Sequence, residues 1–181
     1  MTEVISSRSY FEIFSLPVGW NIERAAVDAR YRQLQQKFHP DRYAAKGDVD
    51  KRLAVQTAAL INDAYQTLIS PLRRAQYLLQ IDGVDADQES HITSDGVFLM
   101  SQIELREELA EIGQDGASPA ALEALASLEQ RVDATYAGLQ DEFSVHYSAG
   151  DQAAAFDIVA KMQFFVKLLD QVEALEEQLD S

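Results

Sequence analysis

The 181-residue chain contains no cysteine. This absence excludes disulfide bonds, thiolate nucleophiles and any metal or cluster held by cysteine, and it fits the reducing cytoplasm. There is also no run of about eighteen apolar residues, so no membrane span is expected. The first residues, Met1 to Ile5, lack a charged stretch followed by an apolar one, so they are not predicted to be a secretory signal. We therefore predict a cytoplasmic protein without a membrane contact.

Motifs of enzymes and of metal sites are lacking as well. The sequence has no glycine-rich phosphate loop, no nucleophile motif and no His-Glu-x-x-His pattern. His91 and His146 are isolated, which is typical of plain polar residues. Four glutamates within residues 104–111 would need partner ligands on other helices to bind two metal ions, and no such pattern is present. The sequence predicts a protein that is not an enzyme and has no cofactor and no metal site.

Acidic residues outnumber basic ones, giving a formal net charge of −15, but they are unevenly distributed. Residues 1–80 hold 11 Lys and Arg and 8 Asp and Glu, whereas residues 81–181 hold 4 and 22. This asymmetry indicates two parts with different partners. The acidic half would repel phosphates, so nucleic-acid binding is not expected. The mildly basic half suits an acidic protein surface.

A short polar segment interrupts the hydrophobic pattern of the N-terminal half at His39-Pro40-Asp41. Pro40 lacks a backbone N–H and disfavours helical geometry in the residue before it, so a helix is predicted to end near His39. The apolar face of that helix is formed by Val27, Tyr31, Leu34 and Phe38. By itself, His-Pro-Asp is also consistent with an ordinary helix stop followed by a turn.

The sequences on either side favour a more specific interpretation. They are SYFEIFSLP at Ser9 to Pro17, ARYRQL at Ala29 to Leu34 and INDAYQTL at Ile61 to Leu68. With His39-Pro40-Asp41 they resemble, in order and over about seventy residues, a J-domain. This resemblance implies a helical hairpin that engages DnaK-class ATPase chaperones through its tip. The residues that it assigns to chaperone binding are His39, Pro40, Asp41, Arg30, Arg32, Lys37 and Arg42.

The segment after the hairpin makes the resemblance more specific, to one family of J-domain proteins. Residues Ser70 to Leu79 read SPLRRAQYLL, which is similar to the HscB family of J-domain co-chaperones in iron–sulfur cluster assembly. The resemblance implies two partners, an HscA-type chaperone and an IscU-type cluster scaffold protein. Some relatives carry a cysteine-rich metal site, which this chain lacks.

We predict an all-α protein with a J-domain over 1–80, a linker over 81–94 and an antiparallel three-helix domain over 95–181. In the J-domain, the helices are expected near residues 10–16, 22–38, 49–70 and 72–79, with Asn21 as the N-cap of the second. In the C-terminal domain they are expected near residues 95–113, 119–149 and 151–179. The predicted buried stripe of the middle C-terminal helix is Leu122, Leu125, Leu128, Val132, Leu139 and Phe143, and that of the last is Ile158, Met162, Phe165, Leu169 and Val172.

The first helix of the C-terminal domain is apolar on two faces. At about 100° per residue, Phe98, Leu105, Leu109 and Ile112 share one face and suffice to pack the helix. The opposite side carries Leu99, Met100 and Ile103, bordered by glutamates. Such a second face either packs on the J-domain or the linker, or binds a partner. The HscB resemblance implies that it binds the scaffold protein, through Leu99, Met100, Ile103, Glu104, Glu107, Glu111 and, on the last helix, Phe164.

The HscB resemblance thus implies a co-chaperone that stimulates the chaperone's ATPase and delivers the scaffold protein to it. Within the same class, the alternative is a J-domain protein that serves another client. Outside it, the alternative is a structural helical adaptor, in which His39 has no role.

Overall fold

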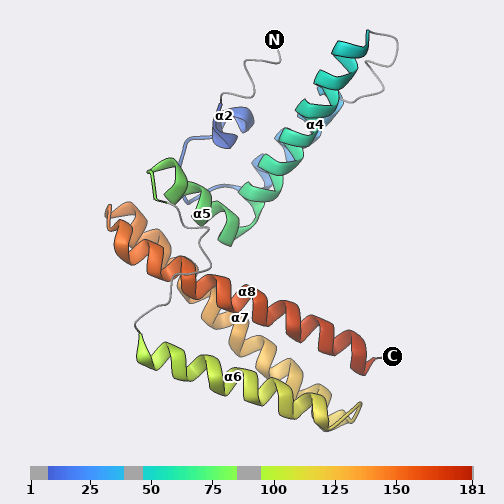
Figure 1. Ribbon diagram of the computed structural model, residues 1–181, viewed down its shortest axis with the longest axis vertical. Helices are drawn as coiled ribbons and strands as arrows, with labels where there is room; N and C mark the ends of the chain where they lie inside the picture. The colour runs from blue at the N-terminus through green and yellow to red at the C-terminus, as the bar shows by residue number, and fades with distance from the viewer. Residues whose placement is uncertain (1–7, 39–46, 85–94, 181) are drawn as a thin grey trace. The chain divides into compact units, whose positions relative to one another are not determined.

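The computed structural model describes residues 8–38, 47–84 and 95–180, and all regular structure within these ranges is helical (Figure 1). The prediction of an all-α protein is therefore confirmed. The chain divides into two compact units, Met1–Asp82 and Gly83–Ser181, which we describe separately. None of the described helices is long and apolar enough to cross a membrane.

The first unit is built on a pair of helices, α3 (Arg24–Phe38) and α4 (Asp48–Ile69). Two shorter helices, α2 (Tyr10–Phe14) and α5 (Pro71–Ile81), pack against this pair. Side-chain hydrogen bonds join Asp28 to Tyr65 and Tyr31 to Asn62, so α3 and α4 run antiparallel. The core is formed by large apolar side chains from all four helices: Phe11, Phe14, Val27, Leu34, Phe38, Ile61, Leu68, Leu78 and Leu79.

Helix α3 begins at Arg24 rather than at Ile22, so Asn21 is not its N-cap. The carbonyl of Glu23 accepts the first hydrogen bonds of the helix, from the amides of Ala26 and Val27. The preceding residue Trp20 is buried, and the guanidinium of Arg74 on α5 lies 4.4 Å from its ring centroid. A tertiary contact to α5 thus lies a few residues before the start of α3.

The second unit is a bundle of three helices: α6 (Gly96–Gln114), α7 (Pro119–Ser148) and α8 (Gln152–Leu179). Each begins with a capping side chain: Asp95, Ser118 and Asp151 accept hydrogen bonds from backbone amides in the first turn of their helices. Pairing is most extensive between α7 and α8, and α6 packs against both.

Two details of the bundle core differ from the predicted stripes. On α7, Leu122 is 38% exposed and its neighbour Ala121 is buried instead, because Ala121 lies closer to the helical angle of Leu125 and Val132. On α8 the buried arc is wider than predicted and includes Phe164 and Leu168, whereas Leu169, a member of the predicted stripe, is only half-buried. Helix α8 contacts both other helices of the unit, so more of its circumference is covered.

Candidate functional site

The predicted chaperone-binding tip lies between α3 and α4. His39, Pro40, Asp41 and Arg42 fall outside the described residues, so their predicted role is not tested by the structure. The structure describes the two helices that flank them, which end at Phe38 and begin at Asp48.

The remaining basic residues of α3 have unequal surroundings. The side chains of Arg32 and Lys37 are exposed, and the ammonium of Lys37 lies 5.3 Å from the ring centroid of Phe38. They point in directions about 140° apart around the helix, since each residue turns by about 100°. Arg32 and Lys37 therefore lie on different sides of α3, and one flat partner surface cannot contact both of them fully.

Arg30 is half-buried and forms hydrogen bonds within the first unit. Its guanidinium donates hydrogen bonds to the hydroxyl of Ser15, at 3.2 Å, and to the amide oxygen of Gln33, at 3.2 Å. Ser15 is the C-cap residue of α2 and has a positive φ of 58°. Arg30 therefore ties α3 to the end of α2, and its predicted role in chaperone binding is not tested by the structure.

A network of polar and aromatic side chains joins the two long helices of the first unit. The rings of Tyr31 and Tyr65 stack with centroids 4.0 Å apart, and the hydroxyl of Tyr65 donates to Asp28 at 2.9 Å. Arg24 forms an ion pair with Asp28 at 3.0 Å. These hydrogen bonds, that of Tyr65 foremost, lower the pKa of Asp28. The network links α3 and α4 outside the core. Sequence reasoning missed it because helical periodicity does not show which polar groups meet between helices.

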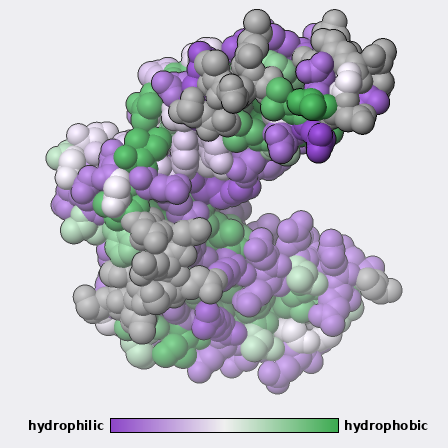
Figure 2. Space-filling view, turned by 45° about the horizontal axis from the view of Figure 1, so that its top comes forward, coloured by the Kyte–Doolittle hydropathy of each residue, from purple (hydrophilic) through white to green (hydrophobic). Residues whose placement is uncertain are grey.

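The predicted second face of α6 is open to solvent. Leu99, Met100 and Ile103 are 37%, 57% and 51% exposed, and Glu104, Glu107 and Glu111 are exposed as well. On the opposite side, Leu109 and Ile112 are buried. Figure 2 shows that hydrophobic residues reach the surface of the molecule in patches among the hydrophilic ones. The exposed side of α6, defined by Leu99, Met100, Ile103, Glu104, Glu107 and Glu111, is called the α6 face below.

One exposed apolar residue near the α6 face escaped sequence analysis. Val97, in the first turn of α6, is 83% exposed. Its helical angle lies about 60° from that of Met100, so it extends the apolar surface toward the start of the helix. Its exposure could have been inferred from the same angular reasoning that singled out Met100.

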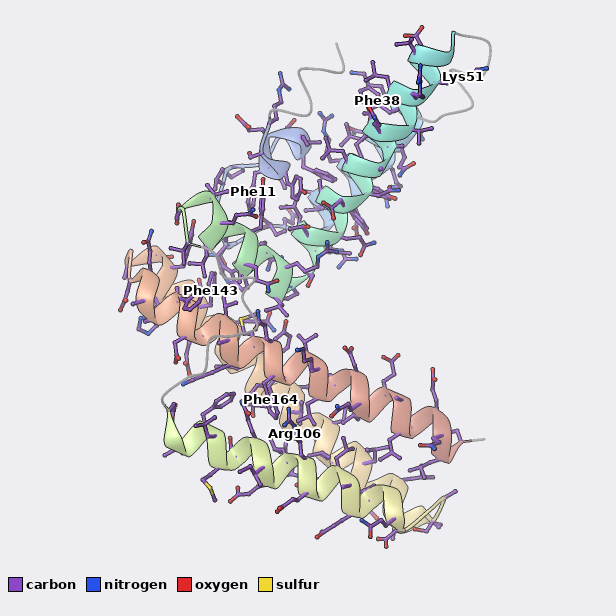
Figure 3. The ribbon with its side chains drawn as sticks, viewed as in Figure 1. Phe11, Phe38, Lys51, Arg106, Phe143 and Phe164 are labelled. Carbon is purple, nitrogen blue, oxygen red and sulfur yellow. The ribbon has the colours of Figure 1, made fainter. Side chains whose placement is uncertain are left out.

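Phe164, which the resemblance assigns to scaffold binding, is buried, and its predicted role is not tested by the structure. Its side chain is only 7% exposed and lies in the contact between α6 and α8 (Figure 3). Its ring meets Phe98 edge to face at 5.8 Å and Phe165 at 5.2 Å. The guanidinium of Arg106 lies 5.2 Å from its ring centroid. Helical angles on α8 alone do not place Phe164 on the buried side of that helix. Because α6 packs against this side of α8, Phe164 is nevertheless covered.

The N-terminal end of α6 is joined to α8 by an ion pair. The ammonium of Lys161 lies 2.7 Å from one carboxylate oxygen of Asp95, and 3.5 Å from the carboxylate of Asp157. The Lys161 bond, followed by the hydrogen bond from the Phe98 amide, lowers the pKa of Asp95. Burial alone would lower the pKa of Lys161, but the bonds and charges of the two carboxylates outweigh it and raise that pKa.

An open groove of about 540 Å³ lies between α6 and α7. Its apolar lining includes Leu105, Val132 and Phe165, and an ion pair between Glu108 and Arg131 joins the two helices beside it. Over the described ranges, no group of three or more acidic or histidine side chains is arranged to hold a metal ion.

Comparison with known proteins identifies the family. Residues 94–173 match the HSCB C-terminal oligomerisation domain. A protein of Vibrio cholerae named co-chaperone protein HscB homolog is 40% identical over 171 residues, which cover 94% of this chain and 98% of that protein. The corresponding protein of Vibrio vulnificus is 39% identical over 173 residues. This chain belongs to the HscB family of co-chaperones.

Solved structures of HscB proteins have the same fold. The chaperone HscB from Vibrio cholerae aligns with a TM-score of 0.82 at 38% identity, over 95% of this chain and 99% of that one. Human co-chaperone protein HscB aligns with a TM-score of 0.85 at 29% identity, over 94% of this chain and 83% of the human chain. Yeast Jac1, at 23% identity and a TM-score of 0.70, shares the fold of these HscB proteins.

Proposed function

We propose that this protein is a J-type co-chaperone of iron–sulfur cluster assembly with two binding sites on one chain. The first unit stimulates ATP hydrolysis by an HscA-type chaperone of the DnaK class. The second unit binds an IscU-type scaffold protein and delivers it to that chaperone. The observation that carries the second half is the α6 face, which stays exposed on a helix that is already packed.

The first unit supports the chaperone half of the proposal. His39-Pro40-Asp41 follows directly on α3, whose partner α4 is bonded to it by the network around Tyr31 and Tyr65. Because the two helices are bonded to each other, less conformational entropy is lost when the residues that follow α3 bind a partner. Arg32 and Lys37 add exposed positive charge to the helix that precedes His39-Pro40-Asp41, which favours approach to an acidic surface.

The α6 face has the chemistry of a protein-binding surface. Covering a large apolar side chain contributes about 1.5–3 kcal/mol. Covering Leu99, Met100 and Ile103 would therefore contribute about 4.5–9 kcal/mol in total. Micromolar affinity requires about 8.2 kcal/mol after the cost of association, so the glutamates and further contacts must supply the remainder. The glutamates at its border favour a partner with basic groups around an apolar centre.

The test is a single-turnover ATPase measurement on the chaperone, with and without the scaffold protein. The wild-type chain is expected to stimulate hydrolysis, and the scaffold to increase the stimulation further. His39→Gln is expected to abolish both effects. The double variant Leu99→Ala, Met100→Ala should keep the basal stimulation and lose the increase caused by the scaffold.

Leu122→Ala is a matched control, because Leu122 is as exposed as Leu99 but lies on α7. It is expected to behave as the wild type. If the wild type stimulates hydrolysis equally with and without the scaffold protein, the protein is a J-domain co-chaperone that serves another client. No stimulation by the wild type would contradict the chaperone half and favour a structural adaptor.

A further inference from the structure

The apolar centre of the α6 face lies in the less firmly packed half of its helix. Leu99, Met100 and Ile103 occupy the first two turns of α6, whereas its buried residues, Leu109 and Ile112, both lie in the second half. Helix ends open most readily where few apolar side chains are buried. In the first turns the apolar packing comes from the half-buried Phe98, which meets Phe164 and Phe165 of α8, so a polar contact at the same place would add to the hold on the helix.

Lys161 on α8 provides that contact. Its ammonium is 2.7 Å from Asp95 Oδ2, while Asp95 Oδ1 accepts a hydrogen bond from the amide of Phe98 at 3.1 Å. One carboxylate thus caps α6 and receives the lysine of another helix. The ammonium also lies 5.4 Å from the ring centroid of Phe98, which packs on Phe165 with centroids 6.1 Å apart.

The surroundings of Lys161 favour a strong interaction. Its side chain is only 18% exposed, so water competes less for the ammonium than at an open surface. Asp157, one turn earlier on α8, lies 3.5 Å away and supplies a second negative charge. A charged hydrogen bond in such a position is stronger and better oriented than an exposed ion pair.

We propose that Lys161, through Asp95, is a positioning residue for the α6 face: it holds the first turns of α6 on α8 and so presents Leu99, Met100 and Ile103 in an ordered helix. This inference rests on the proposed function for the identity of the partner. An ordered face binds more tightly because less conformational entropy is lost on binding. The ion pair thereby sets the affinity for the scaffold protein without touching it.

The first test is hydrogen exchange on the full chain. In Lys161→Met, amides of residues 97–103 are expected to lose about tenfold in protection, the effect of one charged hydrogen bond. The amides of Leu109 and Ile112 and those of α7 should stay as in the wild type. Unchanged protection at residues 97–103, or an equal loss over all three helices, would overturn the proposal.

Three further variants make the test specific. Lys167→Met, which removes an exposed lysine of the same helix, should leave the exchange pattern unchanged. Lys161→Arg, which keeps the charge, should restore most of the protection. Asp95→Asn keeps a capping side chain but removes the negative charge, and should reproduce Lys161→Met. Combining Asp95→Asn with Lys161→Met should add little, because both remove one interaction.

The second test is calorimetric titration with the scaffold protein. Lys161→Met is expected to weaken binding about tenfold and Lys161→Arg to restore it, with basal ATPase stimulation unchanged in both. Wild-type affinity in a variant whose residues 97–103 have lost protection would overturn the positioning role. If the wild type itself does not bind the scaffold, the proposed function fails, and the exchange experiment still decides whether Lys161 orders α6.

Discussion

The ring of Phe98 on α6 stands edge-on to the ring of Phe164 on α8, with centroids 5.8 Å apart and an angle of 88° between their planes. This geometry places the positive edge of one ring against the negative face of the other, which favours the pair beyond its burial. Phe164 thereby belongs to the packing beneath the α6 face.

This position predicts how Phe164 affects function. Phe164→Ala is expected to lower the free energy of unfolding of the second unit by about 3–5 kcal/mol, as for other buried phenylalanines. Scaffold binding should weaken with it, because α6 loses its support. Phe164→Leu, which keeps much of the volume, should retain most of the affinity. Urea denaturation and titration calorimetry measure the two effects. An affinity lost equally in Phe164→Leu, at nearly wild-type stability, would instead indicate direct contact with the partner.

Leu99 and Leu109 lie on the same helix but should respond differently to the same substitution. Leu109→Ala is expected to cost about 2–5 kcal/mol of unfolding free energy, since its side chain is buried. Leu99→Ala should change stability by less than about 0.5 kcal/mol and should weaken scaffold binding. Thermal denaturation and a binding titration on both variants check this. A large loss of stability in Leu99→Ala would contradict the assignment of Leu99 to a free surface.

Substitutions of Arg30 and Arg32 by alanine are also expected to have different effects. Arg30→Ala removes the hydrogen bonds that join α3 to Ser15 and Gln33, and is expected to cost about 1–3 kcal/mol in the stability of the first unit. Arg32→Ala should leave stability unchanged and lower the rate of association with the chaperone, most clearly at low salt. Chemical denaturation and stopped-flow binding distinguish the two. Equal stability of both variants would contradict the anchoring role of Arg30.

The hydroxyl of Tyr10 is predicted to lose its proton at a higher pH than an ordinary tyrosine. Burial, followed by its hydrogen bond to Asp63, raises the pKa of the Tyr10 hydroxyl to about 12, from an ordinary value of 10.0. Because the pKa is higher in the folded state, its contribution to stability is complete below pH 10 and is lost as the pH rises toward 12. A difference titration at 295 nm between the wild type and Tyr10→Phe should show a transition near pH 12. Asp63→Asn should move that transition to lower pH, and a transition near pH 10 in the difference between wild type and Tyr10→Phe would contradict the assignment.

Local signals were enough to predict the bundle helices closely. Ser118-Pro119 marks the start of α7, and Gly150, whose φ is 73°, forms the turn before α8. The exposure of Leu99, Met100 and Ile103 followed from helical angles in the same way. These features depend on residues close together in the chain, so one sequence suffices to predict them.

The errors arose where distant residues meet. Asn21 is a residue type that is common at N-caps, but α3 begins only at Arg24, after Trp20 has packed against Arg74 of α5. Phe164 lies off the main stripe of α8, and its burial depends on the path of α6. The ion pair of Asp95 and Lys161 joins residues 66 positions apart, which no periodicity reveals.

The two-sided character of α6 has a consequence for how such a protein changes during evolution. Side chains that hold the helix in the bundle, such as Leu109 and Ile112, differ from those exposed on the α6 face. Substitutions at Met100 or Ile103 can accumulate in step with a changing partner while the fold is conserved. Two lineages could therefore keep one architecture and yet lose the ability to exchange partners.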